Sequence, residues 1–166
     1  MAKPGLVTRI RAGLLRTFRG RPRGTAAWEA ELPVSAGAPE NFALGELTLA
    51  VRPLGLKAAG ENRPSIVYEV SLSGPGDPRG WSSSYGLPPA SASARRAAEA
   101  ALDELDEVGR DPAAWVARLT AGMSEDEAEA MLDSPAVKAD QRAAGWVAPN
   151  LEPLRSQRAR WGAWLG

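Results

Sequence analysis

The period of the hydrophobic pattern changes along the chain, and this change constrains the fold more than any other feature. From residue 47 to residue 85 apolar side chains often alternate with polar ones, whereas from residue 94 they recur every three or four residues. A period of two buries one face of a β-strand, and a period of 3.6 buries one stripe of an α-helix. Strands that precede a run of helices are typical of the α+β class.

The alternating region predicts a small antiparallel sheet of three strands. The central strand is the clearest, and residues 47–51 and 81–85 supply the strands on either side. The Gly- and Pro-rich run 73–80 can only be a turn, and residues 53–64 form a polar connection. We expect the apolar side chains of the central strand to face the helices; they are Ile66, Tyr68, Val70 and Leu72.

Four or five helices are expected after the sheet. A short polar side chain that can cap the first turn precedes each of the first four; the caps are Ser91 or Ser93, Asp111, Ser124 and Ser134. Ser124 and Glu127 have the spacing of a capping box. Gly145 is expected to end the fourth helix.

The sequence therefore divides into an arm at 1–24, a linker at 25–43, an α+β domain at 44–148 and an amphipathic C-terminal segment at 149–166.

Charge is segregated along the chain. The first 24 residues hold seven basic side chains and no acidic one, so the rest of this neutral chain has a net charge of minus seven. Residues 4–18 also have the spacing of an amphipathic helix. Such a basic arm is typical of chains that contact a polyanion, a membrane surface or an acidic partner. The candidate contact residues are Lys3, Arg9, Arg11, Arg16, Arg19, Arg21 and Arg23.

The opposite charge lies in the helices. Residues 99–133 have a net charge of minus nine, and residues 134–166 have a net charge of plus three. An acidic helical face is either solvated or a docking site for the basic ends of neighbouring subunits. In the C-terminal segment, Trp161 and Trp164 lie close to basic residues and are candidates for docking on a partner, a membrane interface or the core of the chain itself.

One segment resembles part of a known family. Two strands joined by a turn, followed by the helix start Ser93-Ala94-Arg95-Arg96-Ala97-Ala98-Glu99, resemble the second half of a double-stranded-RNA-binding domain. The resemblance covers about 40 residues and implies that Arg95 and Arg96 contact phosphates. The chain departs from the family because no first helix precedes the sheet and the helix becomes acidic after one turn, so we do not assign it to the family.

The composition excludes several kinds of site. The chain has no cysteine and no histidine, which rules out disulfides, Cys/His metal sites and Ser–His–Asp triads. We therefore expect no enzyme, metal, cofactor or small-molecule substrate. No apolar run is long enough to span a membrane, and arginines interrupt the apolar start, so the expected location is cytoplasmic or within a particle.

These observations lead to three functional expectations. The first is a non-enzymatic accessory protein that contacts nucleic acid non-specifically through the basic arm. The second is a structural subunit of a phage-like or other particle, or a homo-oligomer, whose basic ends dock on acidic helices of neighbouring subunits. The third is a peripheral membrane protein anchored by residues 4–19.

Overall fold

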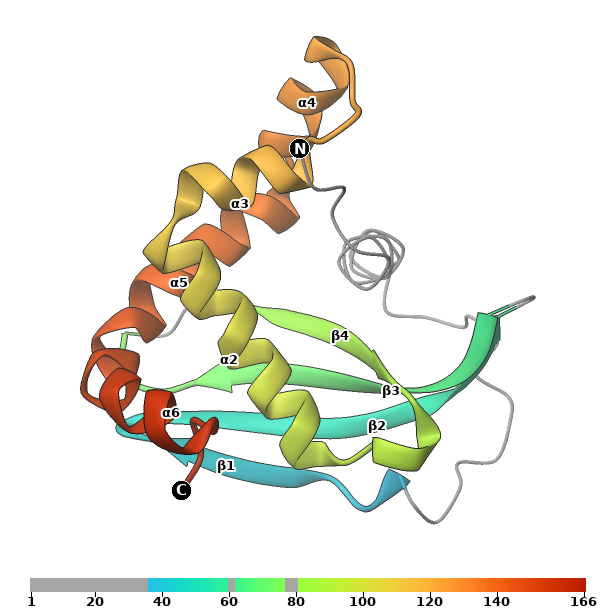
Figure 1. Ribbon diagram of the computed structural model, residues 1–166, viewed down its shortest axis with the longest axis vertical. Helices are drawn as coiled ribbons and strands as arrows, with labels where there is room; N and C mark the ends of the chain where they lie inside the picture. Colours follow the sequence, from blue (N-terminus) through green and yellow to red (C-terminus); the bar gives the residue numbers. More distant parts are fainter. Residues whose placement is uncertain (1–35, 60–61, 77–80) are drawn as a thin grey trace.

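Four antiparallel strands form a sheet in which each strand pairs with the next one along the chain (Figure 1). This computed structural model describes residues 36–59, 62–76 and 81–166, and the basic arm lies outside these residues. The strands are β1 (Glu40–Leu44), β2 (Leu47–Ala59), β3 (Asn62–Ser73) and β4 (Ser82–Leu87). The α+β class and the antiparallel sheet are confirmed.

The strand β1 corrects the expected count of three, because it lies at the end of the segment that was predicted as a linker. Leu44 pairs with Leu47 across a two-residue turn, and Gly45 in that turn has a φ of +59°. Glycine adopts this left-handed conformation at little cost, so the turn closes tightly. A strand of only five residues is too short to stand out by its periodicity, and its pairing with β2 stabilises it.

The hairpin of β2 and β3 is also longer than expected. The strands pair through most of the predicted polar connection, with irregular register between Pro53 and Gly55 and between Lys57 and Ala59. Proline has no backbone N–H for the ladder and is tolerated in strands where the register is disrupted. The pairing therefore passes the proline that marked the end of the predicted strand.

The inner face of the sheet holds the apolar side chains of the central strand. Ile66, Tyr68 and Val70 are completely buried, and Leu72 is 8% exposed. The Tyr68 hydroxyl donates to the carbonyl oxygen of Ala36 at 2.9 Å, which satisfies its polar atom inside the core. Burial and the nearby charge of Glu40 raise the pKa of Tyr68 above its ordinary value.

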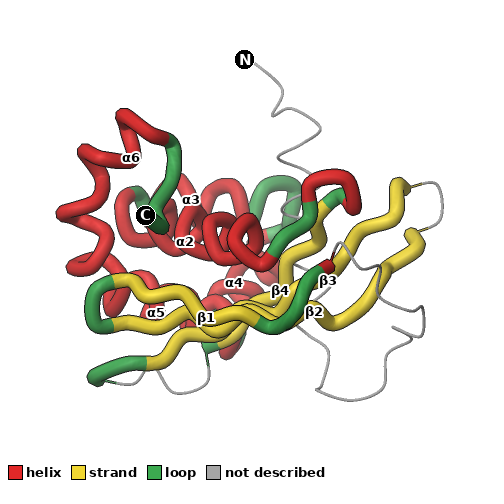
Figure 2. The backbone as a smooth tube through the Cα atoms, turned by 90° about the horizontal axis from the view of Figure 1, so that it is seen from below, coloured by secondary structure: helices red, strands yellow, loops and turns green. Residues whose placement is uncertain are grey.

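The helix α2 (Ala94–Arg110) lies across this face, as the two views in Figures 1 and 2 show. The Ser93 hydroxyl caps it by accepting from the N–H of Arg96 at 3.2 Å. Small side chains on its buried stripe let the helix backbone approach the sheet closely. They are Ala94, Ala97, Ala98 and Ala101, each at most 1% exposed.

The next two helices lie beyond the sheet, and α4 is farther from the sheet than α3 (Figure 1). The helix α3 (Pro112–Leu119) is capped by Asp111, and α4 (Glu125–Leu132) begins with the expected capping box of Ser124 and Glu127. The hydrogen bonds from Ser124 lower the pKa of the Glu127 carboxyl. Trp115 anchors α3 in the core, whereas α4 has no buried residue.

The helix α5 (Pro135–Leu151) packs against α2 and passes Gly145, where the sequence predicted its end. Gly145 lies on the exposed side of α5, and Ala143, Ala144 and Val147 around it are buried. Burial of these side chains outweighs the weak helix propensity of glycine. The predicted boundary between residues 148 and 149 therefore falls inside α5.

After α5 the chain bends through the 3-10 turn η3 (Glu152–Leu154) into α6 (Arg155–Trp161). The C-terminal end of the chain then lies beside the first half of α2 (Figure 1). A 3-10 turn, η2 (Pro89–Ser91), connects β4 to α2.

We predict that Val70→Asp destabilises the protein far more than Ser71→Asp. Val70 is fully buried, so the variant would bury an unpaired carboxylate at a cost of several kcal/mol, whereas Ser71 lies on the outer face. The melting temperature should fall by about 10 °C or more for Val70→Asp and by about 2 °C or less for Ser71→Asp. Equal melting temperatures would show that the strand register is wrong.

Candidate functional site

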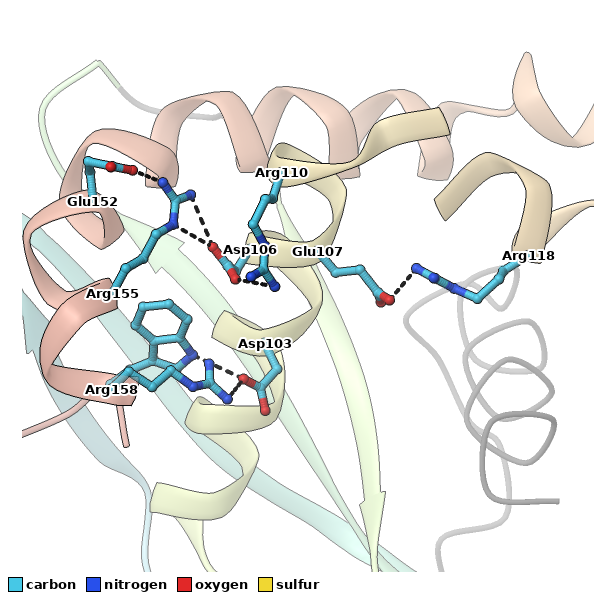
Figure 3. A network of polar contacts seen from close by, with 9 residues as sticks. Asp103, Asp106, Glu107, Arg110, Arg118, Glu152, Arg155 and Arg158 are labelled. Atoms are coloured by element: carbon cyan, nitrogen blue, oxygen red, sulfur yellow. Dashed lines mark hydrogen bonds and ion pairs between the residues drawn. The ribbon is translucent and has the colours of Figure 1, made fainter. Parts of the chain in front are cut away.

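The C-terminal segment, defined here as residues 152–166, is held against α2 by polar contacts. Figure 3 shows those made by Asp103 and Asp106. Three carboxylates of α2 receive it, and we call Glu99, Asp103 and Asp106 the acidic stripe. Their spacing of four and then three residues places them on one face of the helix. This acidic face of α2, which was predicted to be either solvated or bound by a neighbouring subunit, is therefore covered by the end of the same chain.

Asp106 lies at one end of the stripe and is 5% exposed. Its Oδ1 accepts from the Nε of Arg155 at 3.1 Å and lies 3.1 Å from the Nη2 of the same side chain, and its Oδ2 is 3.1 Å from the Nη2 of Arg110. A buried carboxylate is tolerated only when it is paired and hydrogen-bonded. The two arginines satisfy this requirement, and Glu152 forms a further ion pair with Arg155.

Asp103 lies one helical turn closer to the start of α2. It forms an ion pair with Arg158 and accepts from the indole Nε1 of Trp164 at 3.1 Å. The guanidinium of Arg158 also lies 4.2 Å from the centroid of the Trp164 ring, which is a cation–π contact. These three side chains form a closed set of mutual contacts.

Glu99 binds the backbone of the segment. Its carboxylate accepts from the N–H of Trp164 at 2.8 and 3.0 Å and from the N–H of Leu165 at 2.9 Å. These charge-assisted hydrogen bonds hold the backbone of residues 164 and 165 in place, whichever side chains these two residues carry. Trp164 and Leu165 are thereby held in the core, at 4% and 5% exposure.

The two predicted docking tryptophans have different environments. Trp164 is buried on α2, whereas Trp161 is 70% exposed at the end of α6. Of the three places considered for these side chains, Trp164 lies in the core of its own chain. Only Trp161 has a surface that a partner could contact.

The two arginines implied by the RNA-binding resemblance lie on the first turn of α2. Arg95 donates to the carbonyl oxygen of Leu165 and so helps to hold the C-terminal segment. Arg96 is exposed, and none of the residues that the structure describes forms an ion pair with it. The other predicted contact residues, all within residues 3–23, lie outside the described part of the chain.

The outer face of the sheet has an open hollow over β1, β2 and β3. Arg52 and Glu69 face each other across the two central strands, with 2.6 Å between Nη2 and Oε2. This pairing neutralises the cation of the hollow, whose other polar side chains are those of Asn41 and Ser71. The hollow therefore lacks the unpaired positive charge that would favour an anion.

Acidic residues elsewhere in the described part of the chain do not assemble a metal site. Within residues 36–59, 62–76 and 81–166, no group of three or more acidic side chains is arranged to hold a metal ion. In the same ranges, no helix is long and apolar enough to cross a membrane. The hydrogen bond from Lys138, together with its positive charge, lowers the pKa of the Asp133 carboxyl, which is exposed beside α4.

Sequence reasoning missed the acidic stripe as a binding surface for the chain's own end. The signal was present, because acids at positions 99, 103 and 106 match arginines at 155 and 158 in charge and in helical spacing. Comparison with protein-family models, curated proteins and solved structures finds no match to this chain. The functional proposals therefore rest on the contacts and charges of the chain's own residues.

We predict that Trp164→Ala lowers the free energy of unfolding by about 3 kcal/mol or more. The buried indole fills space against α2 and bonds Asp103, so its removal leaves a cavity and an unsatisfied contact. The matched variant Trp161→Ala removes the exposed indole and should change this free energy by about 0.5 kcal/mol or less. Urea denaturation of both variants measures the difference, and similar values would contradict the docking of the segment.

Proposed function

We propose that this chain is a polyanion-binding accessory protein in which residues 1–24 contact nucleic-acid phosphates without sequence specificity. The observation that carries the proposal is the distribution of charge between the arm and the described residues. The arm has seven basic and no acidic residues, whereas residues 36–59, 62–76 and 81–166 hold sixteen acidic and twelve basic ones. The described part therefore has a net charge of minus four.

Six of the twelve basic residues of the described part are also engaged by acids of the same chain. Such ion pairs join Arg52 to Glu69, Arg110 to Asp106, Arg118 to Glu107, Lys138 to Asp133, Arg155 to Asp106 and Arg158 to Asp103. A phosphate that approached these arginines would compete with carboxylates already in place. Affinity for a polyanion comes from cations that release bound counterions, so the arm is the segment suited to it.

The test compares three arm arginines with three exposed arginines of the described part. Arg9→Gln/Arg11→Gln/Arg16→Gln and Arg96→Gln/Arg142→Gln/Arg160→Gln remove the same amount of charge. We expect the arm variant to weaken binding to labelled duplex DNA. The slope of log affinity against log salt should also become shallower by about 2 to 3. Fluorescence anisotropy at several salt concentrations measures both quantities.

The variant in the described part serves as the control for total charge. It should retain nearly the same salt slope as the unmodified protein, because all seven cations of the arm remain. Equal weakening by the two triple variants would show that the arm is not the contact surface. Absence of any DNA binding by the unmodified protein at about 0.1 M salt would remove the proposal altogether.

The exposed acids of α4 favour a second function, assembly through arms that dock on neighbouring copies. Glu125, Asp126 and Glu129 are exposed and form no ion pair with the residues that the structure describes. The acids of α2 are less suitable, because the acidic stripe already binds the C-terminal segment. The second function is therefore that of a structural subunit whose arm binds α4 of its neighbour.

For this second function we predict a salt-sensitive oligomer that Glu125→Lys/Glu129→Lys converts to a monomer. The reversal places like charges opposite the arm, yet should change the unfolding free energy by only about 0.5 kcal/mol per site. Light scattering coupled to size exclusion, at low and high salt, measures the mass. An unmodified protein that is monomeric at low salt would exclude assembly through the arms.

A further inference from the structure

The contacts that hold the C-terminal segment do not depend on its being attached to the same chain. The polar contacts that join residues 152–166 to α2 go to the acidic stripe or to Arg95 and run from side chains or backbone groups of the segment. Arg155, Arg158 and Trp164 make the same contacts whichever copy delivers them. The stripe is thus a recognition surface for this segment.

The connection between α5 and α6 is close to a continuous helix. Leu151, Glu152, Leu154 and Arg155 all have right-handed helical backbone angles, and only the short turn η3 separates the two helices. A continuous helix through this turn would carry residues 155–166 away from their own α2. The segment would then be free to reach another copy.

Pro153 is the residue that favours the bend. It lies in the first turn of η3, where its missing N–H is not needed. Within a continuous helix, its ring would clash with the carbonyl of the residue four positions earlier and it would remove one hydrogen bond. Replacement of Pro153 by alanine removes both obstacles and favours the straight form.

We propose that the acidic stripe also accepts the C-terminal segment of a second copy, so that two chains exchange their segments reciprocally and form a dimer. Such an exchange repeats the observed contacts and closes with two-fold symmetry. The intramolecular segment has a high effective concentration, so the exchanged form increases with protein concentration and with straightening of the turn. The proposal is independent of the arm and of the proposed polyanion binding.

A charge exchange between two full-length variants tests the proposal. Asp103→Arg repels the chain's own Arg158, and Arg158→Asp repels the chain's own Asp103. In a mixed dimer each stripe meets a segment of opposite charge, so both mismatches are relieved. We expect the equimolar mixture to contain at least about tenfold more dimer, at twice the 17.5 kDa of one chain, than either variant alone.

The double variant Asp103→Arg/Arg158→Asp is the control, because it restores the pair within one chain and should reduce the dimer to the level of the unmodified protein. Light scattering measures mass, and circular dichroism checks that each variant is folded. A mixture of folded variants that stays monomeric would overturn the proposal. If either variant is unfolded, Pro153→Ala decides: its dimer fraction should rise about tenfold at equal concentration, and no rise would overturn the proposal.

Discussion

The packing of α2 on the sheet is the interaction on which the rest of the structure depends. One stripe of α2 consists of alanines that press against the strands, and a second face presents the acidic stripe to the C-terminal segment. A third contact joins α2 to α5, so the helix lies between three partners. Because small side chains bring the backbone close to the sheet, loss of this packing would also displace the carboxylates that hold the end of the chain.

Burial of charge explains why the C-terminal segment is so specifically placed. Asp106 is only 5% exposed, and the arginines that pair with its carboxylate come from α2 and from the C-terminal segment. The net charge of a region therefore does not show whether its charged side chains are free to bind a partner. Residues 99–133 are strongly acidic in sequence, yet the acids of α2 and those of α4 differ in whether a partner within the described residues already engages them.

The difference between paired and unpaired charges also explains why the proposed polyanion contact lies in the arm. Cations that are paired with carboxylates contribute little to the attraction of a polyanion, and the described part of the chain carries a net negative charge. Within the chain, the arm is where basic residues occur without acidic ones. Nucleic-acid binding by the arm and exchange of the C-terminal segment use different residues, and so they can be tested separately.

The sequence alone determined the α+β class, the central strand and most of the helix starts, because each of these depends on interactions among neighbouring residues. The cap of Ser93 and the box of Ser124 with Glu127 form within three positions. Tertiary structure decided the pairing of β1, the passage of α5 beyond Gly145 and the burial of Trp164 in place of Trp161. Arg155 and Asp106 are 49 positions apart, and Trp164 and Asp103 are 61 apart. Periodicity in the sequence shows which face of an element is buried, but not which segment covers that face. Only the folded chain brings groups so far apart in sequence within bonding distance.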